Sequence, residues 1–253
     1  VWDRTTMGIS DDKLHQTTSR WTPAIYFSYK PFADSDDISL RAFYKSIFRL
    51  PTFNDLYYTE VGNSNLKPEN THQWDLGLIY AHDWYSGLLR HLELKADGYF
   101  NLVDNKIVAI PKGSGQYRWK MMNVGKVHIA GFEATAEAAL RFHRDWYLLM
   151  CLNYTYQSAT DHTDPTDNDP YYGTYGKQIA YVPWHSASVA ANLNWKDFGV
   201  NYSFIYVGER YHTSANIREN YEQPWYTHDI SATYSLRYRG CKITLGLECN
   251  NMF

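Results

Sequence analysis

The chain has 253 residues, of which 17% are aromatic and 20% are charged, and its formal net charge is −3. This small net charge gives no reason to expect nucleic acid as a partner. No run of about 18 apolar residues is present, so the sequence offers no transmembrane helix, and only a closed β-barrel would let it cross a membrane. The 23 tyrosines and 9 tryptophans suit such a barrel, because their rings are apolar with a polar edge and favour membrane–water interfaces.

Alternating apolar and polar residues predict β-strands along the whole chain. The pattern is clearest at 92–101, where Leu94 and Phe100 fall on one face and Lys95 and Asp97 fall on the other. Read in this way, the chain contains about ten strands, at residues 22–30, 38–48, 71–83, 91–107, 124–141, 145–158, 181–195, 198–208, 226–239 and 241–250.

The connections between these strands alternate in length. Short ones are expected at 31–37, 84–90, 143–144, 196–197 and 240. Long ones are expected at 49–70, 108–123, 159–180 and 209–225. Short turns on one side and long loops on the other are typical of an antiparallel, up-and-down transmembrane β-barrel in a bacterial outer membrane.

A soluble β-sandwich or a lipocalin-like barrel is the alternative, because alternation alone does not say whether the apolar face meets lipid or a protein core. The predicted strands are about 9 to 15 residues long, which exceeds the usual 5 to 6 of soluble sheets and suits a tilted membrane crossing. We therefore expect Leu94, Phe132, Ala134 and Leu236 to face lipid rather than to converge on one another.

Two motifs on the first long loop resemble the paired boxes, F-R-x-P and N-P-x-L-x-P-E, of TonB-dependent outer-membrane receptors. Pro51 ends the strand before the loop, and Arg49 is suited to bind Glu69 or loop carbonyls. We expect the boxes to shape the loop rather than to contact a ligand. The residues that carry the boxes are Phe48, Arg49, Pro51, Asn63, Asn65, Leu66, Pro68 and Glu69.

Four further stretches resemble motifs of the same family and follow its order, at residues 123–133, 181–185, 206–210 and 250–253. The resemblance implies a barrel of about twenty-two strands that surrounds an N-terminal plug domain contacted by TonB. With about ten strands predicted here, residues 1–253 resemble the C-terminal half of such a barrel. We expect this partial barrel domain to lack the plug domain and the final strand.

The resemblance also implies a function. Receptors of this family sit in the outer membrane of Gram-negative bacteria and take up scarce metal chelates, so cobalamin, a ferric siderophore or haem is the expected substrate. The implied partners are the small-molecule chelate, the TonB complex through the plug, and outer-membrane lipid. Such transport needs no covalent chemistry, and no cofactor is expected.

Haem is the least favoured of the three chelates. Haem receptors of this family carry a histidine ligand between the two boxes, whereas residues 52–62 contain none and the nearest is His72. The loop histidines His162 and His212 keep haem open as an alternative.

Two other classes of function stay open as alternatives. One is a passive porin, although porins do not carry the boxes described above. The other is an outer-membrane enzyme built on His185, Ser186 and Ser188. It is disfavoured because both serines point away from His185 on the strand, so the sequence predicts no catalytic residues.

Aromatic and polar residues on the four long loops are the predicted ligand contacts, because sites for small molecules combine rings with a few polar groups. For each single residue the alternative is packing within the loops or at the membrane interface, so the prediction concerns the group. The residues are Tyr57, Tyr58, Tyr117, Trp119, Tyr171, Tyr172, Tyr175, Tyr211 and His212.

An acidic stretch on the third long loop is a weak calcium candidate, since hard cations bind several carboxylate oxygens. Its spacing does not match the calcium-binding EF-hand loop, and Pro165 and Pro170 favour a solvated loop instead. The acidic residues are Asp161, Asp164, Asp167 and Asp169. The three cysteines show no spacing typical of metal ligands, so no other metal site is predicted.

Overall fold

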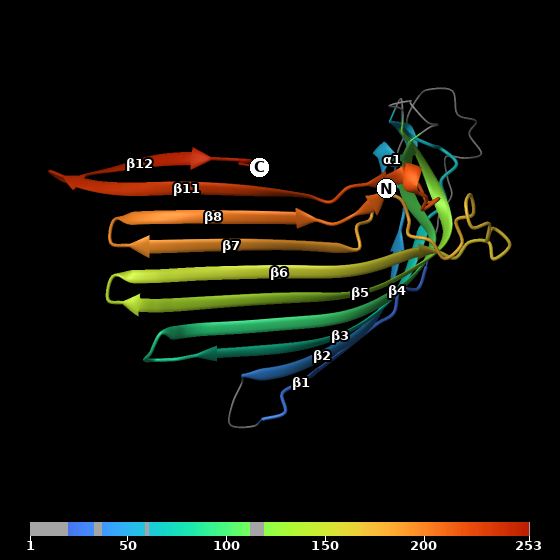
Figure 1. Cartoon of the computed structure of the whole chain (residues 1–253). Helices are drawn as coiled ribbons and strands as arrows, with labels where there is room; N and C mark the ends of the chain where they lie inside the picture. Colours follow the sequence, from blue (N-terminus) through green and yellow to red (C-terminus); the bar gives the residue numbers. More distant parts are fainter. Residues whose placement is uncertain (1–19, 33–36, 59–60, 112–118, 253) are drawn as a thin grey trace.

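The computed structural model describes residues 20–32, 37–58, 61–111 and 119–252. They form a ten-stranded antiparallel sheet in which the strands pair in chain order, together with a two-stranded ribbon of β9 (Arg210–Tyr211) and β10 (Tyr221–Glu222) (Figure 1). The strands of the large sheet are β1 (Ala24–Tyr29), β2 (Ile38–Arg49), β3 (Glu69–Asp83), β4 (Leu89–Pro111), β5 (Trp119–His143), β6 (Trp146–Asp161), β7 (His185–Trp195), β8 (Phe198–Val207), β11 (Trp225–Tyr238) and β12 (Cys241–Cys249).

All ten predicted strands are present, and the alternation of connection lengths is confirmed. In Figure 1 the short turns lie at the left end of the sheet, and the long connections gather at the right end. The long connections carry the helix α1 (Phe53–Tyr57) and the 3-10 helix η2 (Arg218–Asn220). Among the described residues, no helix is long and apolar enough to span a membrane.

Three strand boundaries differ by four or more residues from the sequence prediction: the end of β4, the start of β5 and the start of β7. β4 and β5 extend well beyond the predicted ends at 107 and 124, with Pro111 opposite Trp119, because the two strands satisfy each other's backbone groups after β3 has ended. β7 begins at His185 rather than at residue 181. Tyr181 has a φ of 62°, which is left-handed and incompatible with a strand.

The apolar face of the sheet is exposed. Leu94, Phe132 and Leu236 keep 42%, 43% and 42% of their surface accessible, so they do not converge in a compact centre. The buried hydrophobic cluster lies elsewhere, near the long connections. Its members are Val103, Val124, Val127, Ala159 and Ile179. An outer apolar face without a covering layer of described residues is the arrangement expected for a lipid-facing sheet.

The opposite face is polar and carries its own cross-strand contacts. The guanidinium Nη2 of Arg41 lies 2.7 Å from Oδ1 of Asp97, two strands away. On β5 and β6, the hydroxyl of Thr135 donates a hydrogen bond of 2.9 Å to Oδ1 of Asn153. This face therefore has the chemistry of a hydrated barrel interior.

Adjacent residues on β7 provide a test of these two faces. Val189 lies opposite Leu152 on the apolar face, and Ala190 lies opposite Cys151 on the polar face. We expect Val189→Arg to lower the free energy of unfolding in lipid vesicles by about 2–4 kcal/mol, as measured for arginine near a bilayer midplane. The matched control Ala190→Arg is expected to cost much less, and denaturant unfolding in vesicles compares them. Equal costs would contradict the assignment of the faces.

Candidate functional site

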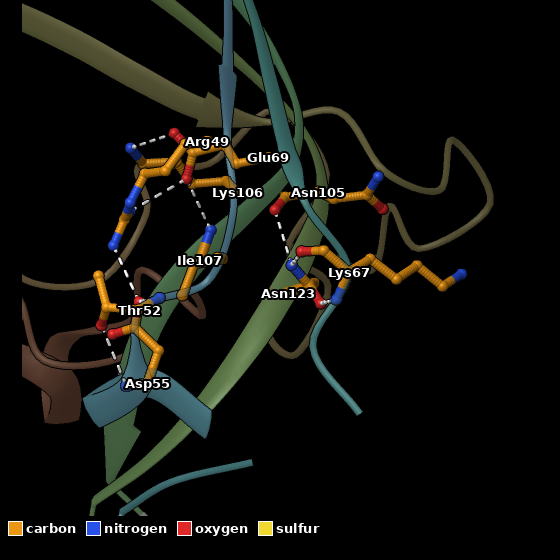
Figure 2. Close-up of polar contacts among 9 residues, drawn as sticks. All are labelled: Arg49, Thr52, Asp55, Lys67, Glu69, Asn105, Lys106, Ile107 and Asn123. Atoms are coloured by element: carbon orange, nitrogen blue, oxygen red, sulfur yellow. Dashed lines mark hydrogen bonds and ion pairs between the residues drawn. The ribbon is translucent and has the colours of Figure 1, made fainter. Parts of the chain in front are cut away.

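The first long loop begins with a capped helical turn. The β2 strand ends at Arg49, and α1 starts after Thr52 in a reciprocal capping box (Figure 2). The Thr52 backbone N–H donates to Oδ2 of Asp55 at 2.8 Å, and the Asp55 N–H donates to Oγ1 of Thr52 at 3.2 Å. Arg49 Nη2 also donates to Asp55 Oδ2, at 3.0 Å. The end of the strand and the start of the helix are therefore fixed by one carboxylate.

Glu69 holds the other end of this loop. It is only 7% exposed, and its Oε2 accepts a hydrogen bond of 3.1 Å from the Ile107 backbone N–H. Arg49 Nη1 lies 3.6 Å from Oε2, and Lys106 Nζ lies 3.4 Å from Oε1 (Figure 2). The sequence left Glu69 and loop carbonyls open as partners of Arg49, and the structure shows the contact with Glu69. Glu69 links the end of β2 and the start of β3 to β4.

The second box is attached to β5 through asparagine side chains. Asn123 Oδ1 accepts from the Lys67 N–H at 2.8 Å, while its Nδ2 donates to the carbonyls of Lys67 and Asn105 at 3.1 and 2.7 Å (Figure 2). Asn63 Nδ2 donates to the Met121 carbonyl at 3.0 Å, and the Asn65 N–H donates to Asn63 Oδ1 at 3.1 Å. These contacts shape the loop and fasten it to the β4–β5 hairpin.

The β4–β5 hairpin is joined to the third long connection, residues 162–184. The His162 N–H donates to the Lys126 carbonyl at 2.8 Å, and the Lys126 N–H donates to Thr163 Oγ1 at 3.0 Å. The rings of Trp119 and Tyr181 also meet, with centroids 5.1 Å apart. The hydrophobic cluster described above includes β4, β5, β6 and Ile179 of this connection, so the contact is both polar and apolar.

Gln178 joins the third connection to the fourth, residues 208–224. Its side chain is fully buried, with Oε1 accepting from the Ala159 N–H at 2.8 Å. Its backbone exchanges hydrogen bonds of 2.7 and 2.9 Å with the amide of Asn216. The Tyr181 N–H donates to the Tyr211 carbonyl at 2.8 Å. Through these links the described parts of the first, third and fourth long connections and the outer part of the β4–β5 hairpin form one continuous surface.

The predicted ligand contacts come to lie in small groups on this surface rather than in one cluster. Tyr58 and Tyr172 are 61% and 75% exposed, and Tyr57, Trp119 and Tyr171 are also exposed. Tyr171 and Tyr172 form an edge-to-face pair 4.7 Å apart. Tyr117 lies outside the described residues.

The more buried candidates are tied into the loops. The ring of Tyr175 packs edge-on against His162 at 5.1 Å. Tyr211 packs against Tyr221 at 6.0 Å, and His212 Nδ1 lies 3.8 Å from Oε1 of Glu222. These rings therefore help to hold the surface together.

A further contact connects the third and fourth connections through a predicted residue. The Tyr171 hydroxyl hydrogen-bonds to Glu219, and this bond and the charge of the carboxylate raise the pKa of the phenol. Tyr171 therefore contacts both Tyr172 of its own connection and Glu219 of the fourth.

The four acidic residues of the calcium candidate, Asp161 at the end of β6 and three in the third connection, act as acceptors for groups of this connection. Donation from the Thr166 hydroxyl and N–H lowers the pKa of Asp164, and the N–H groups of Tyr172 and Tyr171 lower the pKa of Asp169. Asp161 and Asp167 accept hydrogen bonds from the backbone and side chains of this same loop. Over the described ranges, no group of three or more His, Cys, Asp or Glu side chains could hold a metal ion.

Several residues that organise this surface were missed by the sequence prediction. Asn123 opens one of the family-like motifs, but nothing in its local sequence indicates that it binds Lys67. Gln178 and Asn216 lie in irregular segments with no recognisable pattern. A buried, fully bonded glutamine is recognisable only once its partners are known.

A meander of long strands with an exposed apolar face, short turns at one end and linked long loops at the other defines an outer-membrane β-barrel. The chain belongs to the family described as TonB dependent receptor-like, beta-barrel, whose model matches residues 2–252. It is therefore a protein of the Gram-negative outer membrane. The family comprises receptors and not enzymes, which confirms the prediction against an outer-membrane enzyme.

Individual relatives differ in their substrates. The chain is 26% identical over 226 residues to the vitamin B12 transporter BtuB of Photobacterium profundum, covering 88% of the chain and 32% of the transporter. It is 26% identical over 202 residues to the ferric enterobactin receptor of Pseudomonas aeruginosa, covering 76% of the chain and 25% of the receptor. The chain thus spans about a third of the length of such relatives or less.

Solved structures share the fold at lower identity. The ferric citrate transporter FecA in its unliganded form matches with a TM-score of 0.64 at 15% identity, over 91% of the chain and 33% of FecA. The copper transporter OprC matches with a TM-score of 0.61 at 18% identity, over 91% of the chain and 33% of OprC. These matches confirm that the ten-stranded sheet corresponds to part of a TonB-dependent receptor barrel.

Replacing Glu69 tests how the first loop is held. Glu69→Ala leaves the Ile107 N–H without an acceptor and removes the counter-charge of Arg49 and Lys106. We expect the free energy of local opening of this loop to fall by about 2 kcal/mol, with allowance for the partial exposure of both cations. Amide hydrogen exchange at residues 50–58 and 61–68 measures the change.

The control for this experiment is Lys67→Ala. Lys67 is exposed and binds Asn123 through its backbone, so the substitution keeps both hydrogen bonds. Exchange rates that rise equally in both variants, or in neither, would contradict the role assigned to Glu69.

Proposed function

We propose that this chain is part of a TonB-energised transporter that takes up a metal chelate across the outer membrane. The single observation that carries the proposal is the linked surface made by the first, third and fourth long connections and the β4–β5 hairpin, with exposed tyrosines, at one end of a family barrel. A rigid surface of this kind suits a chelate, because ordering loops on binding would cost affinity. Rings and adjacent polar groups supply the contacts that such ligands need.

Cobalamin or a ferric siderophore is the substrate class that we propose. The two loop histidines that would serve haem have other contacts: the ring of His162 stacks on that of His128 at 3.9 Å, and Nδ1 of His212 lies 3.8 Å from Oε1 of Glu222. A chelate that is recognised by its outer shape needs no protein ligand to the metal. This favours contact through Tyr58, Tyr171 and Tyr172 over direct coordination.

The remaining parts of the transport machinery belong to the same proposal. The polar face of the sheet would surround the plug domain, and TonB would reach the transporter through that plug. Charged side chains such as Arg41, Asp97 and Glu133 lie on this face and would contact the plug or its hydration shell. Outer-membrane lipid would cover the opposite face.

Uptake by cells tests the function. A strain that lacks the full-length receptor is grown with cobalamin, ferric siderophores or haem as the sole source of the limiting nutrient. We expect growth to fail on one of these chelates and to return with the receptor gene, provided that TonB is present. Unchanged growth on every chelate would refute the proposal, and uptake that persists without TonB would favour a passive porin.

Two tyrosines test the binding surface. In the full-length receptor, Tyr171→Ala combined with Tyr172→Ala removes two exposed rings, and we expect the chelate that supports growth to bind about tenfold more weakly. Tyr85→Ala is the matched control, because Tyr85 is fully exposed at a short turn on the other end of the sheet. Equilibrium binding measures both, and equal affinities for the two variants would place the ligand elsewhere.

A further inference from the structure

A contact between a ring and a histidine is repeated on every hairpin that carries a long loop. In three of the four cases a tyrosine hydroxyl lies 2.7–2.8 Å from Nδ1 of a histidine on the next strand of the sheet. In the fourth, Phe100 takes the place of the tyrosine and its ring lies 6.2 Å from that of His128. The pairs are Tyr44 with His72, Phe100 with His128, Tyr154 with His185, and Tyr202 with His228.

The four pairs have the same place in the register. Tyr44 is opposite Trp74, so its partner His72 lies two residues farther toward the loop on the same face. Phe100 is opposite Ala130, Tyr154 opposite Ala187 and Tyr202 opposite Ile230, and each histidine again lies two residues toward the loop. Such a diagonal brings long side chains into contact across neighbouring strands. We name the four pairs the His–aromatic belt.

The belt lies on the apolar face, toward the end with the long loops. Its strand neighbours on this face include Leu76, Leu152 and Ile230, which are 65%, 42% and 39% exposed. Long loops of outer-membrane barrels are extracellular, so the belt is at the level of the outer-leaflet headgroups. Tyrosine and tryptophan alone would suffice for an aromatic girdle, and histidine adds a polar ring nitrogen at each position.

The chemistry of the belt favours an anionic partner. When a tyrosine hydroxyl donates to Nδ1, the proton of the neutral imidazole sits on Nε2, which becomes a donor held in a fixed direction. Protonation of the ring adds positive charge without removing that donor. On this face and at this level, the only carboxylate among the described residues is that of Asp104, which lies opposite Lys126 and is offset by it.

We propose that the His–aromatic belt binds the phosphate groups of the anionic glycolipid in the outer leaflet. A tyrosine that donates to Nδ1 sets the tautomer and orientation of its histidine, and at His72 and His185 the Nε2–H is then offered to a lipid phosphate. The belt would thereby hold a shell of phosphorylated lipid around the barrel, just below the loops. Free phosphate has the same chemistry, and the test distinguishes the two sources.

Thermal unfolding of the purified full-length receptor tests the belt. The receptor in detergent is mixed with diphosphorylated lipid A, with the same lipid after removal of its phosphates, or with inorganic phosphate. We expect the phosphorylated lipid to raise Tm most. The combined variant His72→Phe and His185→Phe keeps both rings and is expected to lose most of that rise.

His82→Phe is the matched control, since His82 lies on the same strand and face as His72 but at the end with the short turns. We expect it to keep the full rise in Tm with phosphorylated lipid. An equal rise with dephosphorylated lipid, or an unchanged rise in the double histidine variant, would overturn the proposal. An equal rise with inorganic phosphate would overturn the lipid as the source.

A second variant keeps the test decisive if the double histidine variant does not fold. Tyr44→Phe with Tyr154→Phe reproduces the natural pairing of Phe100 with His128, so the fold should tolerate it. We expect a partial loss of the lipid-dependent rise, because the histidine tautomer is no longer fixed. A full rise would overturn the role of the hydroxyl. None of these measurements uses a chelate, so a negative result for lipid binding would leave the proposed transport function untouched.

Discussion

The structure depends on one constraint, which is that a backbone N–H or carbonyl group facing hydrocarbon must have a hydrogen-bond partner within the protein. A continuous antiparallel sheet meets this condition. Among the described residues each strand pairs with the next along the chain, apart from the short ribbon of β9 and β10. Successive side chains along a strand point to opposite faces of the sheet, so alternating apolar and polar residues place all apolar side chains on one face and all polar ones on the other. The exposed apolar face and the polar opposite face are both consequences of this pairing.

Backbone groups in the loops outside the membrane also need hydrogen-bond partners where they are buried. Segments that leave the membrane have lost their strand partners, and side chains take over as the missing acceptors and donors. Glu69 accepts from the Ile107 N–H, and Gln178 accepts from the Ala159 N–H. Asn123 accepts from the Lys67 N–H and donates to the Lys67 carbonyl. A few buried or half-buried polar side chains therefore make the described parts of the long connections into one surface, although the hydrophobic cluster beneath them is small.

The sequence predicted the sheet well because the two features that identify strands, alternating residues and turn residues, are both local in the chain. Alternation identifies each strand, and the turns that separate strands are marked by residues such as Gly240 or the pair Lys196 and Asp197. The linked surface could be predicted only in part. Arg49 and Glu69 stand at the two ends of one loop, so Glu69 could be named as one of two possible partners of Arg49. Gln178 and Asn216 are 38 residues apart in irregular chain and could not be paired. The ends of β4 and β5 were missed because their outer parts lack alternation and depend on each other.

The four His–aromatic pairs show how the membrane and the loops meet. Each pair joins the two strands that lead into and out of a long connection, so it closes the base of that connection just above the hydrocarbon. Tyr44 and His72 do this for the first loop, whose other contacts are the carboxylate of Glu69 and the amide of Asn123. A loop fixed at its base by one pair and along its length by buried polar groups has few ways to move independently. In the transporter that we propose, access of the chelate to this part of the barrel would depend on the loops as a unit, and lipid bound at their base would affect the whole surface.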